Sequence, residues 1–121
     1  MTISPSSLGG KMRALSNAKY SFIEKSLFQY PDTSADMKRV IEHTLQYFKG
    51  SSAEIMMREF YFKATKRNRS LLGWHRKICM EKLFVTEPHG YVIRKEIVYH
   101  IAMVCYQEAI LHISLEGVEQ E

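Results

Sequence analysis

Apolar side chains recur at steps of three and four residues along most of this chain, and this period constrains the fold more than any other feature. One example is the series Met37, Val40, Ile41, Leu45 and Phe48, which would line one face of a helix. The alternation typical of strands is weak, and only six Gly and three Pro interrupt 121 residues. The sequence therefore predicts an all-α fold.

The expected fold is a five-helix bundle that begins with a helical hairpin and ends with a helix-turn-helix. Turn and capping residues separate the helices, among them the capping-box pattern of Ser51 and Glu54. Ser70 and Thr86 are expected to cap the last two helices, and Pro88 lies in a first turn, where proline is tolerated. The expected helices are 11–30, 37–48, one opened by Ser51, 71–83, and one from Glu87 past Ala109.

Length and composition predict a single soluble domain. A chain of 121 residues can bury one core, and no uncharged apolar stretch approaches the ~20 residues of a membrane span. The first residues lack the basic and apolar regions of a secretory signal, and two cysteines do not form a disulfide framework. We therefore expect a cytoplasmic protein with no membrane partner.

Charge is concentrated in the middle of the chain. Residues 58–95 carry ten Lys/Arg and three Glu, whereas residues 96–121 carry five Glu and no Lys/Arg. A basic block of this kind is typical of surfaces that bind polyanions. The domain prediction is a disordered N-terminus at 1–10, a single helical DNA-binding domain at 11–113 and an acidic tail at 114–121.

Residues 74–102 carry the pattern of a DNA-binding helix-turn-helix. A first helix with the small Cys79 facing inward is followed by the turn Phe84-Val85-Thr86 and by a second helix with polar early positions. In this motif the second helix lies in the major groove of double-stranded DNA. His89 and Arg94 are therefore expected at base edges.

The remaining predicted contacts are to the DNA backbone. Tyr91 suits a phosphate or a thymine methyl group, and backbone N–H groups near Thr86 suit a phosphate. The basic side chains predicted to hold phosphates are Lys66, Arg67, Arg69, Arg76, Lys77 and Lys95.

Metal binding and catalysis are not predicted. His75 and Cys79 are spaced i, i+4, with His100 and Cys105 further on, but no Cys-x-x-Cys pair supports a zinc site. A Cys/His nucleophile pair lacks the glycine turn that would build an oxyanion hole. We expect two core cysteines, no cofactor and no enzyme activity.

The chain resembles the RinA/ArpU-type phage transcriptional regulators over residues 18–110. Their first helix has the pattern Ile-Glu-x-x-Leu-x-x-Tyr, here Ile23 to Tyr30. A second helix follows it in the family, and the third helix resembles Glu54 to Phe62. The segment from Ile78 to Ile97 resembles their sigma-region-4-like helix-turn-helix. The order of four matched pieces carries the likeness more than any single motif.

This resemblance implies a phage or prophage regulator that binds a promoter or operator in the bacterial host cell and activates late genes. It carries the recognition-helix positions onto Thr86, His89, Tyr91, Arg94 and Lys95. Three residues depart from the family pattern, which often has glycine, an apolar residue and arginine at these places: Phe84, Gly90 and Val92.

Other functions remain open at this level. A small terminase-like subunit for DNA packaging would share the fold, and a protein-interaction module would dock to a host protein such as RNA polymerase. The far end of the last helix, with Ile101, Val104, Ala109, Ile110 and Ile113, would pack back on the first helices or form a homodimer seam.

Overall fold

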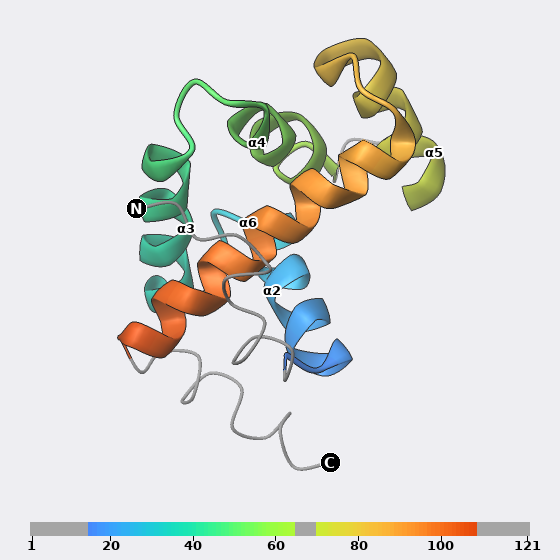
Figure 1. Ribbon diagram of the computed structural model, residues 1–121. Coiled ribbons are helices and arrows are strands. Elements are labelled where there is room, and N and C mark those ends of the chain that lie inside the picture. Colours follow the sequence, from blue (N-terminus) through green and yellow to red (C-terminus); the bar gives the residue numbers. More distant parts are fainter. Residues whose placement is uncertain (1–14, 65–69, 109–121) are drawn as a thin grey trace.

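The computed structural model describes residues 15–64 and 70–108, which form helices and no strands (Figure 1). The five expected helices are present: α2 (Asn17–Gln29), α3 (Ala35–Tyr47), α4 (Ser52–Ile55) continued by η1 (Met56–Tyr61), α5 (Leu71–Ile78) continued by η3 (Cys79–Leu83), and α6 (Glu87–Gln107). The last of them was expected to run past Ala109, but α6 ends at Gln107, where Glu108 is its C-cap. η1 and η3 are π-helical turns. The all-α prediction is confirmed. The predictions for 1–10 and 114–121 lie outside the described residues.

Capping side chains decide where most of these helices begin. Ser16, Ser34, Ser70 and Thr86 each accept a hydrogen bond from the backbone N–H three residues ahead. The first helix was expected from residue 11; residues 11–14 lie outside the described residues, and Leu15 and Ser16 are not helical. α2 begins at Asn17 because Ser16 adopts an extended conformation and caps it. The last two capping predictions are confirmed.

The prediction of a capping box formed by Ser51 and Glu54 is wrong in its hydrogen bonds. The Ser51 side chain caps no helical N–H and donates instead to the Phe48 carbonyl at 2.5 Å. Glu54 accepts a hydrogen bond from the backbone N–H of Gly50 at 2.8 Å, one residue earlier than the motif predicts. Gly50 has φ of 83°, which lets the chain turn sharply before α4.

The long helix α6 forms the axis of the bundle. In Figure 1 it crosses the molecule diagonally, with α3 and α2 beside its C-terminal half and α4 and α5 around its N-terminal half. The described core includes residues of every helix, and α6 contributes the inward series that its apolar period predicts: Ile93, Ile97, Ile101, Val104 and Cys105. None of the helices in residues 15–64 and 70–108 has the length and apolarity of a membrane span.

Candidate nucleic-acid interface

The α5–η3 segment and α6 form a tight helical pair connected by residues 84–86. A Cβ atom built on Gly90 would lie 2.3 Å from the Cys79 sulfur and 3.0 Å from the His75 ring. Such contacts are far too short, so α6 approaches α5 this closely only because residue 90 has no side chain. The prediction that the helices cross closely at Cys79 is confirmed. Gly90, where the resembled family usually has an apolar residue, is the residue that makes this close contact possible.

The connection itself is strained at its first residue. Phe84 has φ of 57° and ψ of 46°, the left-handed conformation that glycine adopts without a steric penalty. This is the position at which the resembled family often has glycine. Val85 follows and packs partly against the core, and its backbone N–H donates to the Cys79 carbonyl at 3.0 Å. The turn keeps its expected length despite the phenylalanine.

The N-terminal half of α6 presents a mixed polar face to solvent. Thr86 caps the helix, and the exposed residues that follow it on this part of the helix include Pro88, His89, Val92, Lys95 and Glu96. His89 and Lys95 therefore lie where the sequence predicts contacts with DNA. Val92 lies between them with 49% of its surface exposed.

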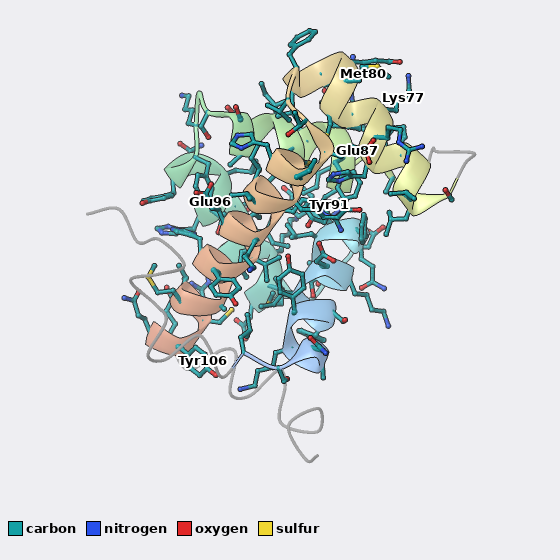
Figure 2. The ribbon with its side chains drawn as sticks, turned by 45° about the vertical axis from the view of Figure 1, so that its right-hand side comes forward. Lys77, Met80, Glu87, Tyr91, Glu96 and Tyr106 are labelled. Carbon is teal, nitrogen blue, oxygen red and sulfur yellow. The ribbon has the colours of Figure 1, made fainter. Side chains whose placement is uncertain are left out.

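Tyr91 lies at the margin of this face. Its ring stacks on the ring of His75 with centroids 4.0 Å apart, and 45% of the residue remains exposed. Figure 2 shows Tyr91 and Glu87 on one side of α6, toward α5, and Glu96 on the other side. Tyr91 thus combines a fixed ring with access to solvent.

Arg94 is the predicted base-contacting residue that the structure contradicts. It is only 6% exposed, and its Nη2 atom lies 2.9 Å from the Oε2 atom of Glu24 in α2. Its guanidinium lies over the Phe60 ring at 4.5 Å. A buried, paired arginine does not reach a base edge, so the assignment of Arg94 to DNA recognition is wrong in this conformation. Its function is to hold α6 against α2 and η1.

The Arg94 pair belongs to a buried polar cluster that also includes His75 and Tyr61. Arg94 Nη1 lies 3.1 Å from His75 Nδ1, and the Tyr61 hydroxyl donates to Glu24. Because a guanidinium only donates, Nδ1 of His75 accepts, and Nε2 carries the proton toward the Glu87 carbonyl oxygen, 3.1 Å away. One tautomer of neutral His75 therefore satisfies both neighbours.

Burial and charge act together on the pKa values of this cluster. Burial lowers the pKa of His75, and the nearby Arg94 cation lowers it further, which keeps the ring neutral. Burial and then the Glu24 carboxylate raise the pKa of Tyr61 well above its usual value. Burial would lower the pKa of Arg94, but Tyr61 and Glu24 outweigh it and raise that pKa.

Two of the three predicted phosphate-binding cations in the described residues are paired with glutamates. Arg76 lies 2.6 Å from Glu87, and Lys77 pairs with Glu81. Exposed pairs of this kind contribute about 0–1 kcal/mol, so the cations remain available for exchange to a phosphate. Lys66, Arg67 and Arg69 lie outside the described residues.

Lys82 is a candidate that the sequence interpretation missed. Among the described residues of α5, η3 and α6, Lys82 and Lys95 are the exposed lysines that form no ion pair. The basic block had indicated Lys82 only as one charge among ten. The expected helix range 71–83 already places Lys82 in the last turn of the first helix of the pair. A side chain in that turn lies close to the start of the second helix, so Lys82 could have been selected from the sequence.

The cysteines lie in the core as expected. Burial raises the pKa of both thiols, that of Cys105 to about 12, so both stay protonated. The described residues contain no group of three His, Cys, Asp or Glu arranged to hold a metal ion. The Trp74 indole N–H donates to the Phe60 carbonyl at 2.8 Å, so Trp74 anchors α5 to η1.

Comparisons of the chain with protein-family models, with curated proteins and with solved structures gave no match.

Proposed function

We propose that this chain is a sequence-specific regulator that binds double-stranded DNA, with the N-terminal half of α6 in the major groove. The observation that carries the proposal is the exposed face that begins at the Thr86 cap and presents His89, Val92 and Lys95. A helix with side chains is about 10–12 Å across and fits a major groove about 12 Å wide. The resemblance to phage regulators supports the same assignment.

The side chains divide into two groups under this proposal. His89 contacts a base edge, and Val92 suits the methyl group of thymine. Lys82 and Lys95 bind phosphates on either side of the major groove. Arg76 and Lys77 do the same after they exchange their glutamate partners for phosphate. Arg94 stays inside and fixes the angle of α6 rather than touching DNA.

The test is a mobility-shift selection on pooled random duplexes, followed by titrations of the selected duplex and a scrambled one. His89→Ala should weaken specific binding by about 1–3 kcal/mol and leave the scrambled duplex unaffected. Lys95→Ala should weaken binding to both duplexes. Lys38→Ala, which removes an exposed lysine from α3, is the matched control and should change neither.

The basic connector provides a separate test of phosphate binding. Replacing Lys66, Arg67 and Arg69 together with alanine should weaken binding to all duplexes alike. The slope of log K against log salt should fall by about 0.9 for each lost phosphate contact.

Failure has a specific meaning. A parent chain that binds no duplex at low salt contradicts the proposal and supports a protein-interaction module instead. A ring-sized native mass together with duplex binding supports the terminase-like alternative.

A further inference from the structure

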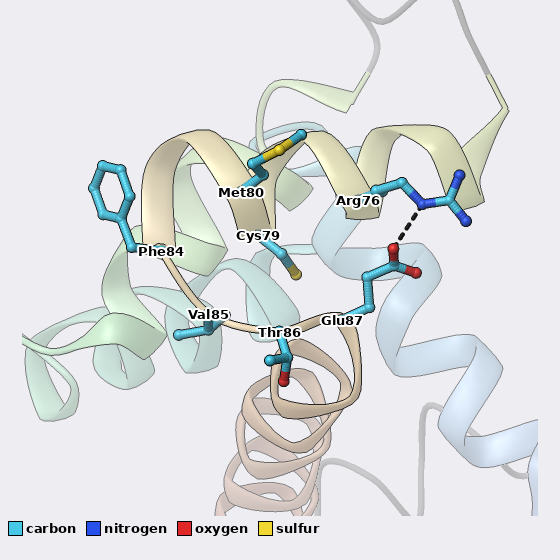
Figure 3. Close-up of a pocket in the computed structure, with 7 residues that line it drawn as sticks. All are labelled: Arg76, Cys79, Met80, Phe84, Val85, Thr86 and Glu87. Carbon is cyan, nitrogen blue, oxygen red and sulfur yellow. Dashed lines mark hydrogen bonds and ion pairs between the residues drawn. The ribbon is translucent and has the colours of Figure 1, made fainter.

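An apolar groove lies at the connection between η3 and α6, next to the Thr86 end of the exposed face of α6 described above. Its volume is about 480 Å³. Figure 3 shows the Cys79 side chain pointing toward Thr86 and Glu87, Met80 on the outer side of its helix, Val85 pointing outward, and the ion pair of Arg76 and Glu87 at one end of the groove. The residues that line it are Arg76, Cys79, Met80, Phe84, Val85, Thr86 and Glu87.

Two large apolar side chains on this groove are exposed to solvent. Phe84 is 81% exposed and Met80 is 61% exposed. Phe84 also adopts a left-handed backbone conformation, which costs about 1–2 kcal/mol for a residue with a Cβ atom. Neither strain nor an exposed ring improves the stability of the isolated chain, and neither side chain suits a phosphate. Residues that combine these features are typical of contact sites.

The charges around the groove favour an acidic occupant. Arg76 and Glu87 line the groove and pair with each other, and on the same α5–η3 segment Lys77 pairs with Glu81, which leaves the exposed Lys82 as the excess positive charge. The Arg76 side chain is 56% exposed despite its ion pair. An apolar segment that also carries carboxylates therefore matches both the groove and its rim.

The sequence of this chain contains such a segment at residues 109–121. It holds Ile110, Leu111, Ile113, Leu115 and Val118 together with three Glu and no Lys or Arg. We propose that residues 109–121 of one copy of this chain dock into the Met80–Phe84 groove of a second copy. The apolar side chains enter the groove, and the glutamates approach the basic rim.

Distance favours a second copy over docking within one chain. α6 has 21 residues, and at about 1.5 Å per residue its ends lie roughly 31 Å apart. The groove lies at the N-terminal end of α6, whereas the segment follows its C-terminal end. Seven fully extended residues, from 109 to 115, span at most about 25 Å. The apolar side chains from Ile110 to Leu115 therefore fall short of the groove of their own chain, and of the five only Val118, with about 36 Å of extended chain before it, lies far enough along to reach it.

The experiment measures self-association of the full chain by sedimentation equilibrium, without nucleic acid. Phe84→Gly removes the ring and relieves the backbone strain, so a loss of association cannot be ascribed to misfolding. We expect it to weaken association at least ~10-fold, as truncating a central aromatic contact commonly does. Met80→Ser should act in the same direction. Ile55→Ser, at an apolar residue of α4 that is 40% exposed and outside the groove, is the control and should have no effect.

A second arm tests the occupant. The double variant I113S/L115S should weaken association as Phe84→Gly does, and mixing these two variant chains should restore part of it, because one has an intact groove and the other an intact segment. A synthetic peptide of residues 109–121 should dissociate the parent assembly, less so at high salt.

Three outcomes would overturn the proposal: a parent chain that is monomeric at millimolar concentration, association that Phe84→Gly leaves unchanged, or association that depends on the groove but not on residues 109–121. Because DNA is absent, none of them bears on the proposed DNA binding.

Discussion

Arg94 and Glu24 lie 70 residues apart in sequence and form a buried ion pair, with 2.9 Å between Nη2 and Oε2. Their side chains are 8% and 16% exposed. The pair joins α6 to α2, and the Tyr61 hydroxyl of η1 donates to the same carboxylate. The contact therefore fixes where the exposed face of α6 points relative to the rest of the bundle.

Removing the charge of Glu24 should destabilise the fold strongly. Glu24→Gln keeps the size of the side chain but leaves the Arg94 cation buried with a neutral partner, which should cost about 3 kcal/mol. Urea unfolding followed by circular dichroism measures the loss. Glu108→Gln breaks an exposed pair with Arg39 and should cost less than about 1 kcal/mol. Equal and small losses in both variants would contradict the function assigned to Arg94.

Adding one methyl group at Gly90 should force the last two helices apart. The new Cβ atom would lie 2.3 Å from the Cys79 sulfur, so Gly90→Ala should lower the free energy of unfolding by about 1–3 kcal/mol. This loss opposes the gain of roughly 1 kcal/mol that alanine brings to a helix interior. Cys79→Ala in the same chain removes the nearest atom and should recover part of the loss. Additive effects in the double-mutant cycle would argue against the contact.

Replacing Phe84 with glycine should stabilise the isolated chain. Phe84→Gly relieves the left-handed backbone strain at the cost of a side chain that is largely in solvent, so we expect a gain of about 0.5–1 kcal/mol. Thermal unfolding of dilute protein checks the sign. Phe84→Ala keeps the Cβ atom and should give no gain, and a glycine variant less stable than the alanine variant would show that the ring is needed for folding.

Stability should fall as the pH drops below 6.5. His100 lies on α6 and stacks on His43 and Tyr47 of α3. Burial, with a smaller contribution from the charge of His43, lowers the pKa of His100 from 6.5 to about 4. The folded state thus favours the neutral ring: its stabilisation is complete above pH 6.5 and is lost as the pH falls toward 4. At about 1.4 kcal/mol per pKa unit, reduced by solvent screening, the loss is on the order of 2 kcal/mol.

His100→Asn provides the control for this pH dependence. Asparagine places a donor near Nδ1, which lies 3.2 Å from the Thr44 hydroxyl, but it does not titrate. Urea unfolding from pH 7.5 to 4.5 should show a flatter profile for the variant. His75, whose pKa burial also lowers, contributes to the decline that remains. A profile unchanged by the substitution would assign the decline to other groups.

The fold could be predicted from the sequence because its signals are local. The helical period, a serine or threonine cap, and the glycine before α4 each depend only on residues a few positions away in the sequence. The π-helical turns could not be predicted in this way, since the apolar pattern of Met56 to Tyr61 fits a regular helix equally well. The start of α2 was misplaced because Lys11 and its neighbours carry no signal that competes with the Ser16 cap.

The site was harder to predict because it depends on contacts between distant residues. Arginine is normally a surface residue, and the partner that buries Arg94 lies 70 residues earlier. One signal was present: Arg94 falls in register with Gly90, Ile97 and Ile101, which line the inward face of α6. The helical register of Arg94, taken ahead of the usual preference of arginine for the surface, predicts that its side chain is buried.

The burial of Arg94 also separates two tasks along α6. The inward positions of α6 form the ion pair of Arg94 and the close contact at Gly90. The outward residues His89, Val92, Lys95 and Glu96 are exposed and take part in neither contact. Substitutions at the outward positions can therefore accumulate at little cost to folding. Under the proposed DNA binding, changes at these four positions would alter which bases are contacted, whereas the inward contacts would keep the angle of α6 unchanged.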